Sequence, residues 1–185
     1  MEIPYTLCFC CFQGQVLMLC RAKSPNAGLW NGLGGKIHGD ETPLACVQRE
    51  MEEEAGIRLD DASSFIFAGI STWRHNQGPI KGMYVYIAHL SPRQAEQVRE
   101  RATPEGLIAW KSLSWVCDTQ NKAVVDNIPL FLLLMLEPEA APCEYLCDYR
   151  EDDNQDEYVV QLVVRTLPPE VVLEECLPDR VFEGL

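Results

Sequence analysis

The chain has 185 residues, 47% of them hydrophobic and 23% charged, which is typical of one globular domain with its own core. Its longest apolar run, 128–136, is too short to span a bilayer, and the N-terminus lacks the basic-then-apolar pattern of a secretory signal. We therefore expect a cytoplasmic protein without a membrane partner. A net charge of −13 repels nucleic-acid phosphates, so we expect no nucleic-acid partner, whereas a small polyanion is compatible if a cation bridges it to the protein.

The nine cysteines indicate a reducing compartment. An odd number is a poor disulfide framework. Cys143 and Cys147 are four residues apart, but no second pair or nearby histidine completes a zinc set. We expect the cysteines to be small buried hydrophobic residues.

The first half of the chain predicts a hairpin, a glycine-rich loop and a helix. β-Formers and aliphatic residues fill 5–12 and 15–20 on either side of a Gln-Gly turn. A loop with four glycines covers 27–35. A helix then begins at Pro43 with Thr42 as its N-cap, and Gly56 ends it.

The second half predicts further strands and shorter helices. Strands are expected at 64–73 and 82–89, a short helix at 91–101, a β-rich stretch at 107–116 and a buried helix at 128–136. A late hairpin is expected at 143–149 and 158–166, around an acidic loop at 150–157. Strands around isolated helices predict an α+β fold, a mixed sheet with helices packed on its faces.

The chain is predicted to have a single domain, residues 1–166, which includes the late hairpin at about 143–166. Residues 167–185 form a C-terminal tail with three prolines, which we expect to be loosely attached. The sequence leaves the oligomeric state open.

The predicted helix places three like charges on one side. Glu50 is three residues before Glu53 and four before Glu54, so the three side chains share a face. Each close pair costs roughly 0.2–0.5 kcal/mol, and anions near a helix C-terminus are disfavoured by the dipole. A solvated acidic face is one explanation. The other is an all-oxygen site for Mg²⁺ or Mn²⁺, formed with carbonyls of the adjacent glycine loop.

The loop and the helix resemble the signature of Nudix hydrolases, G-x5-E-x7-R-E-U-x-E-E-x-G-U, in which U is apolar. A chance match in a chain this long is on the order of one in ten million at ordinary residue frequencies. The matching residues are Gly35, Glu41, Arg49-Glu50-Met51, Glu53-Glu54 and Gly56-Ile57.

The resemblance implies an α/β/α sandwich and hydrolysis of a nucleoside diphosphate linked to another moiety. It implies that Glu50, Glu53, Glu54 and the Gly34 carbonyl bind Mg²⁺, with Mn²⁺ as a substitute. It also implies that Glu41 pairs with Arg49 to hold the loop on the helix.

Similarity over most of the chain points to the MutT-like subgroup, which removes oxidised purine nucleoside triphosphates such as 8-oxo-dGTP. The segment 30–36 resembles that group's WNGFGGK, and Glu105 resembles a distal glutamate that adds a metal ligand or a base. Val124 stands where some members have a tryptophan in the base pocket. With this resemblance we expect substrate contacts for Thr6, Asn31, Gly34, Gly35, Lys36, Asp126 and Asn127. Arg21 and Lys23 border the glycine loop in sequence, so we expect them to contact the phosphates.

Several of these residues also have ordinary structural roles. Asn31 is a typical turn residue, and Asn127 is a typical helix cap. Arg21 and Lys23 are surface charges by default. Glu53, Glu50 and Glu105 are the candidates for the base that activates a water, and the sequence does not choose among them. Glu54 and Arg49 complete the predicted catalytic set.

The favoured function is Mg²⁺-dependent hydrolysis of an oxidised purine nucleoside triphosphate to a nucleoside monophosphate and pyrophosphate. The first alternative is a Nudix enzyme for another nucleotide, such as dihydroneopterin triphosphate, a nucleotide sugar or ADP-ribose. The second is a Nudix domain that senses nucleotides without cleaving them, although the complete acid set argues against it.

Overall fold

One mixed sheet of nine strands organises the protein in the computed structural model, which describes residues 1–138, 140–151, 157–171 and 173–177. The order is β6-β7-β2-β1-β5-β4-β8-β9, and β3 pairs with β2. The strands are β1 Glu2–Phe12, β2 Gln15–Arg21, β3 Trp30–Asn31, β4 Ser64–His75, β5 Lys81–His89, β6 Arg101–Thr103, β7 Gly106–Ser112, β8 Cys143–Glu151 and β9 Glu157–Thr166.

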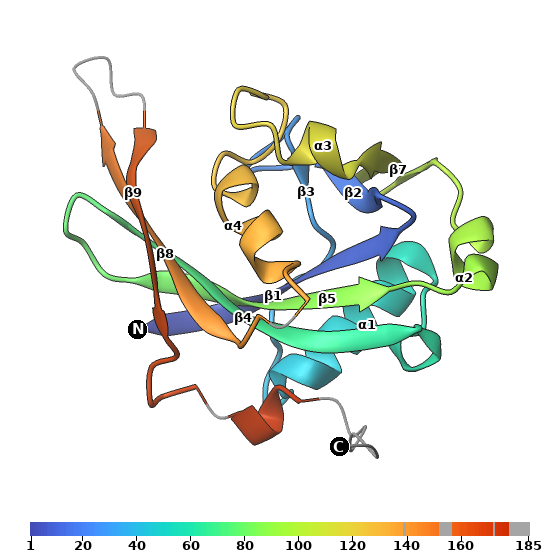
Figure 1. Ribbon diagram of the computed structural model, residues 1–185, viewed down its shortest axis with the longest axis horizontal. Helices are drawn as coiled ribbons and strands as arrows, with labels where there is room; N and C mark the ends of the chain where they lie inside the picture. Colours follow the sequence, from blue (N-terminus) through green and yellow to red (C-terminus); the bar gives the residue numbers. More distant parts are fainter. Residues whose placement is uncertain (139, 152–156, 172, 178–185) are drawn as a thin grey trace.

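Helices lie on both faces of this sheet (Figure 1). Val47 and Met51 of α1 belong to one core cluster, whereas Phe131 and Leu132 of α4 belong to the other. The predicted mixed sheet with helices on its faces is therefore confirmed. The helices are α1 Pro43–Ala55, α2 Pro92–Gln97, α3 Leu113–Val116 and α4 Ile128–Met135, with 3-10 turns at η1 Leu59–Asp61 and η2 Leu173–Glu175.

The sheet is mixed because two of its pairs are parallel. β1 runs parallel to β5, and β4 runs parallel to β8, while the other strand pairs are antiparallel. The first hairpin turns at Gln13 and Gly14, whose φ values of 47° and 75° are those of a tight β-hairpin turn. This central part of the sheet supports both the glycine loop and α1.

Helix α1 begins and ends as its sequence predicts. The Thr42 hydroxyl accepts a hydrogen bond of 3.2 Å from the Ala45 N–H, and Pro43 occupies the first turn. Gly56 ends the helix in the left-handed region, at φ 70°, and its N–H bonds to the Glu52 carbonyl. The two caps fix where the helix begins and ends, and so place the acidic residues in its second half.

Two predicted elements are shorter than expected. The β-rich stretch 107–116 ends as a strand at Ser112, whose hydroxyl accepts from the Trp115 N–H and so caps α3. The helix predicted at 91–101 ends at Gln97, because Val98 takes an extended conformation and buries its side chain in the core. Arg101 then begins β6 rather than ending a helix.

The C-terminal region is more closely attached than its prolines indicate. β8 and β9 form the predicted hairpin and extend the sheet (Figure 1), although residues 152–156 of its acidic loop lie outside the described residues. Beyond it, Val171 and Cys176 are buried, 7% and 1% exposed, in the cluster that contains α1. The expectation of a loosely attached tail is wrong for these residues, because the cluster has an apolar surface that they cover.

The cysteines are all free thiols, and six of the nine are buried. Burial raises the pKa of the Cys11, Cys147 and Cys176 thiols to about 12, so these groups remain protonated and unreactive. Among the described helices, none has the length and apolar character needed to cross a membrane.

Candidate active site

The glycine loop is held against β1 by backbone hydrogen bonds. The Thr6 N–H donates to the Gly35 carbonyl at 2.9 Å, and Cys8 and Leu33 exchange two bonds of 2.7 and 3.1 Å. Gly34 has a φ of 142°, and a Cβ there would overlap the Thr6 carbonyl. A side chain at Gly35 would overlap the Glu50 carboxylate. These two glycines are therefore needed for the loop to approach both the strand and α1.

Arg49 connects the loop to the helix. Its Nε and Nη2 donate to the two carboxylate oxygens of Glu41 at 2.9 and 3.0 Å, which is a bidentate pair. Its Nη2 also donates to the Lys36 carbonyl at 3.3 Å. The hydrogen bond from Arg49 is the main cause of the lowered pKa of Glu41.

The three acidic side chains on the predicted metal-binding side of α1 have different surroundings. Glu50 and Glu53 accept from Nη1 of Arg49 at 2.8 and 3.2 Å, with side chains 14% and 61% exposed. Glu54 instead accepts from the Gly34 N–H at 2.9 Å. The pKa of Glu54 is raised to about 7, mainly by burial and also by the nearby charges of Glu50 and Glu105, while the bond from Gly34 opposes the shift.

The carboxylate oxygens of Glu50, Glu53 and Glu54 are the type of ligand that a hard divalent cation prefers. Three carboxylates outnumber the single guanidinium among them, and α1 has no basic residue in its last turn to balance the charge. The charges of Glu50 and Glu105 also contribute to the raised pKa of Glu54, after the larger effect of burial. Within the described part of the chain, no three acidic, thiol or imidazole groups already stand in a metal-binding arrangement, since Glu50 and Glu53 are directed at Arg49.

Glu105 approaches the acidic face of α1 from the turn between β6 and β7. Its carbonyl accepts from the Ala22 N–H at 2.8 Å, and its carboxylate lies 3.4 Å from the Lys23 ammonium. Its charge influences Glu54, as does that of Arg21. The structure thus brings Arg21 and Glu105 close enough to Glu54 to affect its pKa, and it pairs Lys23 with Glu105.

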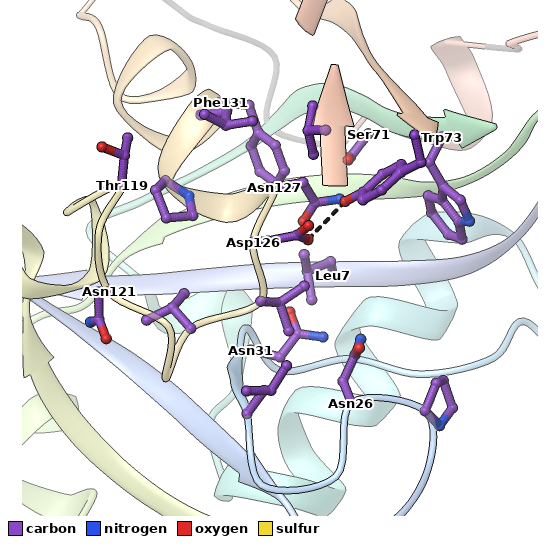
Figure 2. A pocket seen from close by; sticks show the side chains of 18 of the residues that line it. Leu7, Asn26, Asn31, Ser71, Trp73, Thr119, Asn121, Asp126, Asn127 and Phe131 are labelled. Carbon is purple, nitrogen blue, oxygen red and sulfur yellow. Dashed lines mark hydrogen bonds between the residues drawn. The ribbon is translucent and has the colours of Figure 1, made fainter. Parts of the chain in front are cut away.

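A cavity of about 720 Å³ lies between the sheet and the segment that leads into α4 (Figure 2). Asn31, Asp126 and Asn127 line it, as labelled in Figure 2. Asn127 is the N-cap of α4 but makes no side-chain cap bond, so its amide is not used by the helix. The Asn31 amide oxygen accepts a hydrogen bond of 2.9 Å from the Gly32 N–H, so the NH₂ group of Asn31 is left for a ligand.

One loop links the acidic face to this cavity. Asn31 lines the cavity, and Gly34, three residues later, bonds to Glu54. Three residues of extended chain span roughly 10 Å. A ligand with a ring in the cavity and a charged group at α1 would therefore be comparable in size to a nucleotide.

Thr6 and Lys36, which we expected to contact the substrate, lie away from the cavity. The Thr6 side chain is 3% exposed, and its hydroxyl lies 3.3 Å from the Cys46 thiol of α1. Lys36 pairs with Tyr5 in an isolated β-bridge and offers its carbonyl to Arg49. Neither residue lines the cavity that contains Asn31 and Asp126.

Several cavity residues that the sequence did not identify as site residues come from two neighbouring strands. Ser71, Trp73 and His75 come from β4, and Tyr149 comes from β8. No motif marks them, because they reach the cavity only through the parallel pairing of β4 with β8, in which His75 stands opposite Tyr149. Val124, at the position of the absent tryptophan, also lines the cavity.

Comparison with known proteins places this architecture in a family. A family model for the Nudix domain matches residues 4–128, so the chain belongs to the Nudix family, whose enzymes hydrolyse pyrophosphate bonds. The oxidized purine nucleoside triphosphate hydrolase of Mus musculus is 29% identical over 103 residues, which cover 51% of this chain and 62% of the mouse protein. The protein of the same name from Danio rerio is 40% identical over 47 residues, 25% of this chain and 30% of the fish protein. Both matches thus span less than two thirds of the relative.

Solved structures show the same fold at low identity. The mutator MutT protein from Bacillus halodurans has a TM-score of 0.58 at 19% identity, covering 86% of this chain and 95% of its own. The MutT protein from Methanosarcina mazei has a TM-score of 0.55 at 21% identity, with coverage of 73% and 95%. The Nudix domain of Shewanella oneidensis NrtR, complexed with ADP-ribose, has a TM-score of 0.55 at 16% identity, with coverage of 73% and 86%.

Proposed function

We propose that the protein hydrolyses a nucleoside triphosphate to a nucleoside monophosphate and pyrophosphate, and that its preferred base is an oxidised purine of the 8-oxo-dGTP type. The observation that carries the proposal is the connection of two sites by one loop. Asn31, Asp126 and Asn127 offer polar groups in a cavity, and Gly34 and Gly35 lie on the acidic face of α1. A volume of about 720 Å³ is in the range of small-molecule sites.

Glu50, Glu53 and Glu54 would hold Mg²⁺ or Mn²⁺, together with the Gly34 carbonyl and Glu105. When bound, such an ion neutralises phosphate charge and lowers the pKa of a coordinated water. The ligands must be ionised to bind, so metal binding would require Glu54, whose pKa is raised to about 7, to be deprotonated.

The chain's own residues position the reaction. Arg49, paired with Glu41 at 2.9 Å, keeps the loop on the helix, and Arg21 and Lys23 supply positive charge for the phosphates. Glu53 is the favoured base for the attacking water, because its side chain is 61% exposed whereas that of Glu50 is 14% exposed. Glu50 and Glu105 are the other candidates.

The cavity supports a preference for an oxidised base through its acceptors. Oxidation at purine C8 turns the acceptor N7 into an N–H donor, which the Asp126 carboxylate or the Asn127 amide oxygen can accept. Unmodified guanine offers a lone pair at that position, so these oxygens would be left without a partner.

A substrate panel tests the proposal. Release of pyrophosphate or monophosphate is measured with 8-oxo-dGTP, dGTP, dihydroneopterin triphosphate, a nucleotide sugar and ADP-ribose. We expect the highest kcat/KM for 8-oxo-dGTP. A higher value for one of the last three would replace this proposal by that substrate class, and absence of turnover with every compound would indicate a nucleotide-sensing domain.

A further inference from the structure

The late hairpin contributes one polar atom to the proposed base site. The Tyr149 hydroxyl, from β8, donates a hydrogen bond of 2.8 Å to Oδ1 of Asp126, the dashed line at Asp126 in Figure 2. We propose that Tyr149 is a positioning residue for base recognition, which holds Asp126 with one carboxylate oxygen as an acceptor for an N–H group of the base. This inference rests on the function proposed above.

Tyr149 is suited to hold a partner in place because it is itself rigidly held. Its side chain is 7% exposed, and its ring stacks on His75 with centroids 5.1 Å apart and planes at 25°. Its carbonyl accepts from the Asn76 N–H at 3.1 Å, and β8 is paired along β4 at this level. The hydroxyl is thus attached to the sheet rather than to a loop.

Asp126 has no comparable support of its own. It is exposed and lies in the turn that leads into α4, and among the described residues only Tyr149 forms a hydrogen bond with its carboxylate. Without that bond, the side chain is free to rotate among its rotamers. With it, the carboxylate is held in one orientation by Oδ1, and Oδ2 is directed as an acceptor toward a donor of the ligand.

This arrangement places part of the selectivity outside the region that defines the family. The Nudix model ends at residue 128, whereas Tyr149 is in the hairpin that follows α4. The recognition of an N7–H donor would therefore depend on two segments 23 residues apart. It would be lost in a chain that kept the acidic helix and Asp126 but not the hairpin tyrosine.

A double-mutant cycle tests the proposal. The values of kcat/KM for 8-oxo-dGTP and dGTP are measured in wild type, Tyr149→Phe, Asp126→Ala and the double variant. A hydrogen bond to a charged group corresponds to about a tenfold effect, so we expect Tyr149→Phe to lower kcat/KM for 8-oxo-dGTP about tenfold, chiefly through KM. The value for dGTP should stay nearly unchanged. In the Asp126→Ala background, the tyrosine substitution should have no further effect.

Tyr145→Phe is the matched control. It removes a hydroxyl from the same strand at a buried tyrosine that packs on Phe131 and does not line the cavity, so its selectivity should equal that of wild type. A second variant, His75→Ala, removes the ring that stacks on Tyr149 but keeps the Tyr149 hydroxyl. It should lower the ratio of kcat/KM for 8-oxo-dGTP over dGTP. Melting temperatures identify any variant that is simply unstable.

Each result points in one direction. Wild-type selectivity in Tyr149→Phe would overturn the proposal, as would a tyrosine effect that persists in full when Asp126 is absent. An equal loss for the two nucleotides would show a structural role only. If the function proposed above is wrong, wild type itself will show no preference for 8-oxo-dGTP over dGTP, and this separates the two failures.

Discussion

The carboxylate of Glu54 accepts a hydrogen bond of 2.9 Å from the backbone N–H of Gly34. This bond connects the end of α1 to the loop that leads back to Asn31 and the cavity. The carboxylate is partly buried, and this burial is the main cause that raises the pKa of Glu54 to about 7, whereas the bond from Gly34 lowers it. Burial of this acidic group therefore comes at a cost to the stability of the metal-free protein.

That cost predicts a pH dependence in the absence of metal. Between pH of about 4.5 and 7, folded Glu54 retains a proton that the unfolded chain has released, so stability falls as pH rises through this range. Glu54→Gln should be at least as stable as wild type at about pH 8 in EDTA and should lose less stability between about pH 5 and 8. Urea denaturation at the two pH values measures this, with the exposed Glu52→Gln as control. A Glu54→Gln protein that is less stable than wild type at about pH 8 would assign Glu54 a structural role.

Activity should require a divalent cation. In excess EDTA, pyrophosphate release should fall to background and return with Mg²⁺ or Mn²⁺, because the carboxylates of α1 otherwise repel the phosphates. Full turnover in EDTA would exclude the metal-dependent mechanism.

Loss of the favoured base should be severe and specific. Glu53→Gln should lower kcat roughly 10²- to 10⁴-fold with the fold intact. Glu52→Gln, at the exposed neighbour on the same helix, should keep near-wild-type activity. Comparable losses in the two variants would mean that the general acidity of α1, rather than the side chain of Glu53, determines the rate.

Two adjacent glycines should respond differently to alanine. At Gly34 the new Cβ meets the Thr6 backbone at a φ of 142°, so Gly34→Ala should destabilise the protein by about 1–3 kcal/mol. At Gly35 the nearest atoms to the new Cβ belong to the Glu50 carboxylate, a side-chain end that can move. Gly35→Ala should therefore lose activity with a smaller change in melting temperature. The reverse order of stabilities would show that the loop is not held as described.

Selectivity should depend on the polar residues before α4. Asp126→Ala and Asn127→Ala should each lower the ratio of kcat/KM for 8-oxo-dGTP over dGTP, with the main loss on the oxidised base. The Mg²⁺ concentration that gives half-maximal rate should stay the same, because neither residue lies among the acids of α1. An unchanged ratio in both variants would remove these residues from base recognition.

The C-terminal tail should contribute to stability through one buried thiol. Cys176 is 1% exposed, so Cys176→Ala should cost about 1 kcal/mol. Its neighbour Leu177 is 46% exposed, and Leu177→Ala should change stability by less than about 0.5 kcal/mol. Equal effects, measured by denaturant unfolding, would mean that the tail does not pack on the core as the structure shows.

The sequence by itself determined the features that depend on neighbours along the chain. The period of an α-helix puts Glu50, Glu53 and Glu54 on one side, and Thr42 and Gly56 mark the ends of that helix. The first hairpin follows from its β-forming residues and its Gln-Gly turn, and the mixed sheet was expected from the order of strands and helices along the chain. The strand and helix in 107–116 were not separated, because the cap at Ser112 overrides the strand propensity of the residues after it.

Only the tertiary structure decided which distant residues meet. Tyr149 reaches Asp126 because β8 runs parallel to β4, and nothing in the residues between them specifies that register. The burial of Cys176 depends likewise on an apolar surface that the whole fold creates. Local spacing is set by backbone geometry, whereas long-range pairing is set by which apolar faces the sheet leaves to be covered, and that is a property of the assembled chain.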